Sequence, residues 1–187
     1  MLTLKDFTFD FDQKGLFQFY GKPGHGKTAV LIEFATQAVS KDMKVVFIDC
    51  SAQISMKRFK AYLSREDMQK VVFFLPKSLK ELLRTVDNLE LLGLYKQACV
   101  CVDNMFFYYT DPRGKIGDDK VLRYYAYILS ILARISKNSP VIVTNNSFKH
   151  DETIARPFNE FMTAKWIHCN FFLKKGKEGE IYLENIG

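Results

Sequence analysis

One short segment constrains the fold of this chain more than any other. Residues 21–28 read GKPGHGKT, which matches the pattern G-x-x-x-x-G-K-[ST]. Such a loop needs a strand to deliver it, glycines to permit its tight path, and a helix beginning at its lysine so that backbone N–H groups meet phosphate. LFQFY precedes the loop at 16–20 and KTAVLIEFATQAVS follows it at 27–40. The segment therefore predicts a strand, a phosphate-binding loop and a helix in succession.

Short apolar runs rich in Val, Phe and Ile recur along the chain. Hydrophobicity that continues over five or six residues favours strands covered on both faces, as in a parallel sheet. The runs lie at 16–20, 44–50, 71–75, 98–103 and 140–145. Segments with helical spacing or charge lie between them, at 27–41, 55–69, 78–92 and 119–137. This alternation predicts an α/β fold with a mostly parallel central sheet flanked by helices.

The end of the chain has a different pattern. Residues 165–175 and 180–186 alternate apolar and polar side chains on either side of the turn GKEG. Two such segments around a glycine-containing turn predict an antiparallel hairpin at one sheet edge. Because the chain contains no internal repeat, low-complexity run or linker, we expect residues 1–187 to form a single domain.

Composition limits the class of protein further. The 27 Lys and Arg residues exceed the 21 Asp and Glu residues and give a net charge of +6, which suits either a nucleic-acid partner or an ordinary, mildly basic surface. Cys50, Cys99, Cys101 and Cys169 have neither paired nor metal-site spacing, which favours buried thiols in a reducing compartment. The N-terminal segment MLTLKDFTFDF resembles neither a signal peptide nor a membrane span. We therefore expect a cytoplasmic protein with no membrane partner.

The side chains of the loop have assignable roles. Lys27 is expected to neutralise β- and γ-phosphate charge, Thr28 to supply a hydroxyl ligand to Mg²⁺, and the N–H groups around 24–28 to surround the β-phosphate. The alternative is a glycine turn without a ligand, which the flanking strand and helix disfavour. His25 is expected to point to solvent, and the alternative is that it reaches the γ-phosphate. The nucleotide-binding loop is predicted to comprise Gly21, Lys22, Pro23, Gly24, His25, Gly26, Lys27, Thr28 and Ala29.

A second metal-binding residue follows a buried strand. A phosphate-binding loop of this kind needs an acid at the end of a neighbouring strand, where it holds Mg²⁺ through water. Asp103 directly follows the apolar residues ACVCV. The alternative is that Asp103 begins a turn or caps a helix. GTPases are disfavoured because the comparable strand end, VTNNSF at 143–148, lacks the guanine-reading Asn-Lys-x-Asp motif.

The order of these segments resembles that of the RecA/RadA family of recombinases, and in particular their shorter archaeal paralogues that consist of the ATPase core alone. The similar segments run from about residue 16 to the end: FQFYGKPGHGKT, VVFIDCSAQISMKRF, CVCVDN, VIVTNNSF and NFFLKKGKEGEIYLENIG. The resemblance implies a P-loop NTPase of RecA-like type that binds ATP and Mg²⁺ and acts in DNA recombination or repair. Single-stranded DNA and another RecA-family protein or recombinase are the implied partners. The alternative is a KaiC-like signalling ATPase that does not act on DNA.

The resemblance also implies roles for residues outside the loop. Arg58 matches the arginine that lies against adenine, and its alternative is a solvated charge on a helix. Segments 104–118 and 146–165 match the two loops that grip DNA in the family, where aromatic and cationic side chains suit single strands. The alternatives are an ordinary mobile loop or a contact with another protein. The candidate DNA-binding residues are Tyr108, Tyr109, Arg113, Lys115, Lys149, His150 and Arg156.

The chain departs from the family pattern at three points. Ser51 stands where the family has a glutamate that polarises the attacking water, and loss of a general base removes about 10²–10⁴ in rate, so slow or absent hydrolysis is expected. Asp49 and Gln53 are the nearest substitutes. Asn146 replaces the glutamine that senses the γ-phosphate and is one methylene shorter, so weaker coupling is expected. Only residues 1–20 precede the loop, without a DNA-binding domain, which predicts a helper of a recombinase or paralogue.

Overall fold

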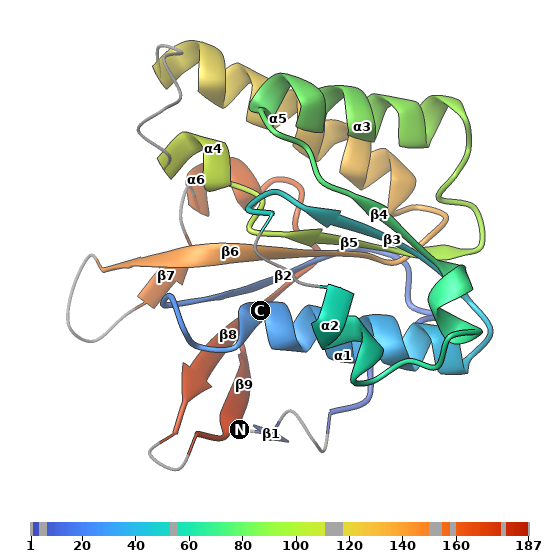
Figure 1. The fold of residues 1–187 in the computed structure, drawn as a ribbon. Helices are drawn as coiled ribbons and strands as arrows, with labels where there is room; N and C mark the ends of the chain where they lie inside the picture. Colours follow the sequence, from blue (N-terminus) through green and yellow to red (C-terminus); the bar gives the residue numbers. More distant parts are fainter. Residues whose placement is uncertain are drawn as a thin grey trace.

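The expected strands assemble into one sheet in the computed structural model of the protein, which describes residues 2–3, 7–52, 56–110, 118–149, 155–157, 160–176 and 179–186. Across these ranges the sheet has nine strands, in the order β1-β9-β8-β2-β6-β5-β3-β4, with β7 beside β6 (Figure 1). The strands are β1 (Leu2–Thr3), β2 (Leu16–Gly21), β3 (Lys44–Asp49), β4 (Val71–Phe74), β5 (Ala98–Asp103), β6 (Val141–Lys149), β7 (Ala155–Pro157), β8 (Cys169–Lys175) and β9 (Ile181–Asn185).

Most of the sheet is parallel. Adjacent strands from β8 through β2, β6, β5 and β3 to β4 pair in parallel, whereas β8 with β9, β9 with β1, and β6 with β7 pair antiparallel. The expected parallel sheet and C-terminal hairpin are therefore confirmed. β1 adds a two-residue strand outside the hairpin. It is too short to produce a recognisable pattern of alternating side chains.

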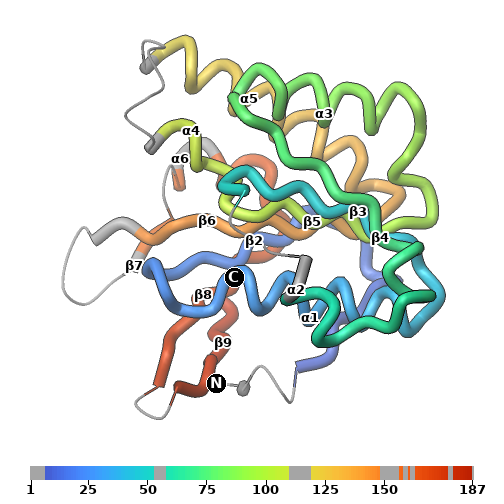
Figure 2. The backbone as a smooth tube through the Cα atoms, in the orientation of Figure 1, coloured from blue at the N-terminus to red at the C-terminus, as the bar shows by residue number. Residues whose placement is uncertain are grey.

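Helices cover both faces of the sheet. α1 (Lys27–Ser40) and α2 (Met56–Lys60) lie on one face, and α3 (Leu79–Leu91) and α5 (Asp118–Ile135) on the other; Figure 2 shows the same layers as a backbone path. The two remaining helices are the single turns α4 (Phe107–Thr110) and α6 (Glu160–Thr163). Because both faces are covered, consecutive strand residues such as Val45 and Val46 are both buried. This explains why the strands appear as continuous apolar runs.

The helix expected over 55–69 is wrong in extent. α2 ends at Lys60, and after a turn a 3₁₀-helix covers Asp67–Lys70. The hydroxyl of Ser64 accepts a hydrogen bond from the backbone N–H of Asp67 at 3.0 Å and donates one to its carboxylate at 2.8 Å. Such local side-chain bonds compete with α-helical hydrogen bonding. The segment therefore breaks into two short pieces.

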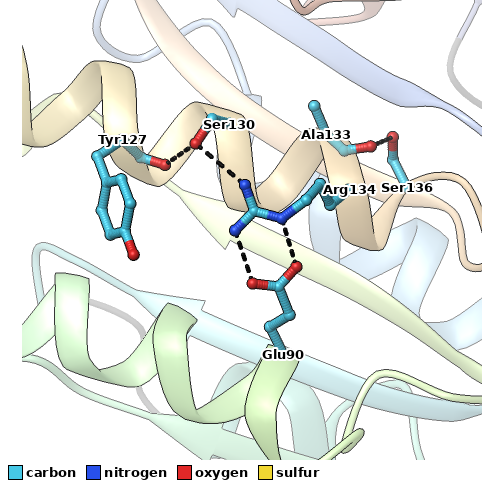
Figure 3. Close-up of polar contacts among 6 residues, drawn as sticks. All are labelled: Glu90, Tyr127, Ser130, Ala133, Arg134 and Ser136. Atoms are coloured by element: carbon cyan, nitrogen blue, oxygen red, sulfur yellow. Dashed lines mark hydrogen bonds and ion pairs between the residues drawn. The ribbon is translucent and has the colours of Figure 1, made fainter.

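An ion pair joins α3 to α5 on the outer surface (Figure 3). The Arg134 guanidinium donates two hydrogen bonds to the Glu90 carboxylate, from Nε at 2.6 Å and from Nη2 at 2.7 Å. These hydrogen bonds lower the pKa of Glu90 below its ordinary value of 4.5. Ser130, one turn earlier on α5, lies 3.5 Å from Nη1 of the same guanidinium. The pair therefore holds the two helices in one geometry.

Arg134→Gln is expected to lower the free energy of unfolding by about 0.5–1 kcal/mol at pH 7, as bidentate pairs at partly exposed sites do. Because the folded-state pKa of Glu90 is depressed, this stabilisation is present above pH 4.5 and is lost as the pH falls through the folded-state value. Urea unfolding at pH 7 and pH 3 should thus give a larger difference between variant and parent at pH 7 than at pH 3. Arg123→Gln, exposed on the same helix, is the matched control. An equal loss at both pH values would contradict the prediction.

Candidate nucleotide-binding site

The loop GKPGHGKT connects strand β2 to helix α1 as expected. β2 ends at Gly21 and α1 begins at Lys27, with Gly26 as its N-cap residue. Gly24 and Gly26 have φ angles of 81° and 82°, in the left-handed region that favours glycine. The first N–H groups of α1 therefore open into the loop, and the positive end of the helix dipole lies where a phosphate would bind.

The C-terminal hairpin packs directly against this loop. A Cβ atom placed on Gly21 would lie 2.7 Å from the carbonyl oxygen of Leu173, and one on Gly26 would lie 2.1 Å from Cδ1 of Ile181. His25 is half-buried, and its Nδ1 lies 3.2 Å from the Leu173 carbonyl oxygen, so the expectation that it points to solvent is wrong. The hairpin strands β8 and β9 thus pack against the loop through Leu173 and Ile181.

Lys27 is held inside the loop. Its ammonium donates hydrogen bonds to the carbonyl oxygens of Gly21 at 2.9 Å and Lys22 at 3.0 Å. Burial lowers the pKa of Lys27 to about 8, with Asp103 acting in the opposite direction. A buried ammonium near the N-terminus of α1 would be stabilised by the negative charge of a phosphate. This placement fits its expected role.

Asp103, at the carboxyl end of β5, contacts Thr28 of α1. The Thr28 hydroxyl donates to Oδ2 of Asp103 at 2.7 Å, and the Thr144 hydroxyl donates to Oδ1 at 2.6 Å. Asp103 is 3% exposed. Burial raises its pKa, while the hydrogen bonds from Thr144 and Thr28 act against that rise. Asp103 is therefore a fixed acceptor beside the loop.

The sequence predicted that Asp103 lies on a strand next to β2. This prediction is wrong, because β5, which carries Asp103, is not adjacent to β2. β6 lies between β2 and β5, so the carboxylate reaches Thr28 across one intervening strand. Thr144, at the end of the apolar part of β6, fills the gap. Sequence reasoning missed Thr144. The available signal was a hydroxyl residue at the end of the apolar run PVIVT.

A cavity of about 480 Å³ joins these groups, which is in the size range of small-molecule sites. Ser51, Arg58 and Asn146, three residues that the sequence pointed to, contribute to its wall together with the loop and Asp103. Asn104 and Phe107, which sequence reasoning missed, also line it. The full lining comprises Pro23, Gly24, Gly26, Lys27, Thr28, Ala29, Ser51, Arg58, Asp103, Asn104, Phe107 and Asn146.

The residues present fit a magnesium ion accompanied by a phosphate. The Thr28 hydroxyl and the Asp103 carboxylate are hard oxygen donors, which Mg²⁺ prefers, and the metal commonly takes its remaining ligands from water and substrate phosphates. Within the described ranges no cluster of three or more His, Cys, Asp or Glu could hold a metal by itself. Any cation here would thus depend on the bound phosphate.

The weaker catalytic candidates differ in position. Asp49 is fully buried, and its Oδ1 accepts hydrogen bonds from both the backbone N–H and the hydroxyl of Ser51, each at 2.9 Å. Asp49 is not among the lining residues of the cavity, whereas Ser51 is. Gln53 lies outside the described residues.

The candidate DNA-binding residues are only partly described. Tyr108 and Tyr109, on α4, are half-buried against the core beneath α3 and α5, and the Tyr108 hydroxyl donates to the Pro76 carbonyl oxygen. Arg156, exposed on β7, pairs with Glu160 at 3.4 Å. Lys149 ends β6, so part of the expected loop 146–165 is a two-stranded ribbon. The side chain of Lys149, and all of Arg113, Lys115 and His150, lie outside the described residues. DNA binding by these residues stays a prediction.

Fold and site together define a P-loop NTPase of the RecA-like type. The chain is similar in sequence to archaeal proteins named RadB: it is 28% identical over 142 residues to "DNA repair and recombination protein RadB" of Methanococcus maripaludis, covering 72% of this chain and 64% of that protein. The protein of the same name from Methanosphaera stadtmanae is 25% identical over 161 residues, with 80% and 68% covered. The expected resemblance is confirmed.

The fold relationship is seen in a solved structure as well. A crystal structure of the RadB recombinase superposes with a TM-score of 0.70 at 23% identity, covering 91% of this chain and 80% of that one. No known protein-family profile matches the chain. It spans about two thirds of the length of the relatives, 64% for the M. maripaludis protein. Among the helices of the described ranges, none combines the length and the apolar character needed to cross a membrane.

Proposed function

We propose that this chain binds Mg·ATP and acts in DNA recombination or repair as an accessory protein of a recombinase, with slow ATP hydrolysis. One observation carries the proposal. The 2.7 Å hydrogen bond between Thr28 and Asp103 joins the phosphate loop to the metal-binding acid within one cavity. The names of the relatives support the recombination and repair pathway. In this role residues 1–187 act as a single RecA-like core domain in the cytoplasm.

Five residues of the cavity wall have roles in this proposal. Lys27 neutralises the β- and γ-phosphates, and Thr28 and Asp103 hold the metal, directly and through water. The Arg58 guanidinium stacks on adenine. Asn146, within β6 and directly before the part of it that pairs with β7, contacts the γ-phosphate and transmits its presence to the ribbon formed by β6 and β7. Bound Mg²⁺ would neutralise charge on the phosphates during their transfer.

Hydrolysis is expected to be slow because no spare carboxylate lines the cavity among the described residues. Of those lining residues, Asp103 alone is acidic, and two threonine hydroxyls donate hydrogen bonds to its two oxygens. Turnover below about 1 per second is expected, at the low end of enzyme rates. A protein of this kind would hold ATP for long periods and act as a nucleotide-gated partner of a recombinase or another RecA-family protein.

Direct binding to DNA is tested by filter binding of a single-stranded oligonucleotide over a salt series. Phosphate contacts predict that the logarithm of affinity falls linearly with the logarithm of salt concentration. Lys149→Ala should reduce the magnitude of that slope by about 1. Lys96→Ala changes an exposed lysine just before the amino end of β5, whereas Lys149 is at the carboxyl end of β6; this control should leave the slope unchanged. If the parent bound no oligonucleotide at low salt, direct DNA binding would be wrong and a regulatory ATPase would be favoured.

A further inference from the structure

We propose that Ser51 is a catalytic residue of the slow hydrolysis, and that its hydroxyl oxygen holds the water that attacks the γ-phosphate. The inference rests on the proposed binding of Mg·ATP. It assigns an active role to a side chain that stands where the related recombinases have a glutamate. Its basis is the geometry of the turn that follows β3.

The hydroxyl of Ser51 has one defined direction. Its O–H donates to Oδ1 of Asp49 at 2.9 Å, and its backbone N–H donates to the same oxygen at 2.9 Å. A serine hydroxyl has one donor and two acceptor lone pairs. Because the proton is directed at Asp49, the oxygen is left as an acceptor, and Ser51 lies in the cavity wall. Such an oxygen can accept a hydrogen bond from a water molecule inside the cavity.

Asp49 acts as a positioning residue for this hydroxyl. Its side chain is fully buried, and hydrogen bonds to a carboxylate are about twice as strong as those between neutral groups. Asp49 pairs in register with Asp103 on the adjacent strand β5, so the turn after β3 starts level with the metal-binding acid. The serine is therefore fixed relative to the site where Mg²⁺ and phosphate would bind.

The backbone of this turn is also unusual. Ala52, the residue after Ser51, has a φ angle of 52°, a left-handed conformation that is uncommon for alanine. Asn104, after Asp103, has a φ angle of 53°, which asparagine adopts more readily than alanine. A left-handed alanine costs free energy, and such residues concentrate at functional sites. The turn that contains Ala52 begins at Ser51, which lines the cavity.

The chemical step needs no further reagent. The water oxygen forms a bond to the γ-phosphorus, and the bond from that phosphorus to the bridging oxygen breaks, with its electron pair leaving on ADP. The water hydrogen directed at Ser51 is then lost to a phosphate oxygen or to solvent. The Ser51 hydroxyl keeps its own proton, which stays hydrogen-bonded to Asp49. Ser51 contributes orientation and not basicity. Turnover is therefore expected to be faster than without the hydroxyl and slower than with a general base.

The test is steady-state hydrolysis of Mg·ATP by the full chain, with nucleotide binding followed separately by the ATP-induced shift in melting temperature. Ser51→Ala should lower kcat about tenfold or more, as loss of an orienting contact does, without changing the melting shift. Ser51→Thr retains the hydroxyl and should stay within about threefold of the parent. If Ser51→Ala fails to fold, Ser51→Cys decides, because it keeps the shape and replaces the oxygen with a weak acceptor.

Two results would overturn the inference. One is a kcat for Ser51→Ala or Ser51→Cys equal to that of the parent. The other is a parent protein that shows the ATP-induced shift but no hydrolysis above the protein-free rate. In both cases the proposed ATP binding would be retained, and only the proposed role of Ser51 would be wrong. A parent with no ATP-induced shift would instead refute the proposed function, and this inference with it.

Discussion

Lys27→Ala is expected to abolish the stabilisation of this protein by ATP. The ammonium lies within hydrogen-bonding distance of the Gly21 and Lys22 carbonyl oxygens, at the N-terminus of α1, where the phosphates would bind. A ligand that binds only the folded state stabilises it by about 2.7 kcal/mol at a concentration of 100 times its Kd. Without the ammonium that affinity is lost, and so is the shift in melting temperature produced by Mg·ATP.

A second lysine in the same loop provides a matched control. Lys22 is exposed, and its carbonyl oxygen, which an alanine also supplies, accepts the hydrogen bond from Lys27. Lys22→Ala should therefore keep most of the ATP-induced shift. A Lys27→Ala variant that melts with the parent's shift would contradict the assignment of this loop as the nucleotide site.

The features that sequence predicted well are those that local chemistry determines. The positive φ angles of Gly24 and Gly26 are properties of the loop itself, and the pattern of its glycines indicates them directly. The inner parallel strands β3 and β5 appear as apolar runs because both of their faces are covered. The hairpin was predictable because its alternating segments flank a glycine-containing turn. In each case the determining residues are neighbours along the chain.

The order of the strands was not predictable in the same way. Buried parallel strands have similar compositions, so nothing in β2, β5 or β6 marks β6 as the one between the other two. Thr144 depends on this order, because its hydroxyl reaches Asp103 only when β6 lies beside β5. His25 depends on the hairpin in the same manner, since its partner Leu173 is distant in sequence. Side chains whose partners come from tertiary packing could not be assigned beforehand.

Competition between local and regular hydrogen bonds accounts for another difference. The segment 55–69 has helical composition, but the Ser64 hydroxyl accepts a hydrogen bond from the backbone N–H of Asp67. This local bond competes with a continuous α-helix. Arg58 nevertheless falls on α2 and in the cavity wall, as the resemblance implied. The position of this residue relative to β3 therefore mattered more than the length of the helix that carries it.

Asp103→Asn is expected to remove the part of the ATP-induced stabilisation that depends on Mg²⁺. Loss of a residue that holds a metal through water typically costs about 10–100-fold in metal affinity. Asparagine has nearly the same shape and keeps one oxygen acceptor for a threonine hydroxyl, so the fold should be retained. Burial raises the pKa of Asp103, so the substitution removes a charge that burial disfavours, but one threonine hydroxyl loses its carboxylate acceptor. The melting temperature of the variant without ligand is therefore the reference for its shift. The measurement is the melting shift with ATP, in the presence of Mg²⁺ and of EDTA.

Asp49→Asn separates metal binding from a general effect of charge. Asp49 is buried at the end of the adjacent strand, in register with Asp103, but its carboxylate accepts hydrogen bonds from Ser51 and does not line the cavity. Its variant should keep the parent's Mg²⁺-dependent shift. If both variants lost that shift equally, the loss would result from the reduced negative charge at the ends of β3 and β5, and Asp103 would not be assigned as a metal ligand. A loss confined to Asp103→Asn would mean that the hydrogen bond between Thr28 and Asp103 marks the place where the metal binds.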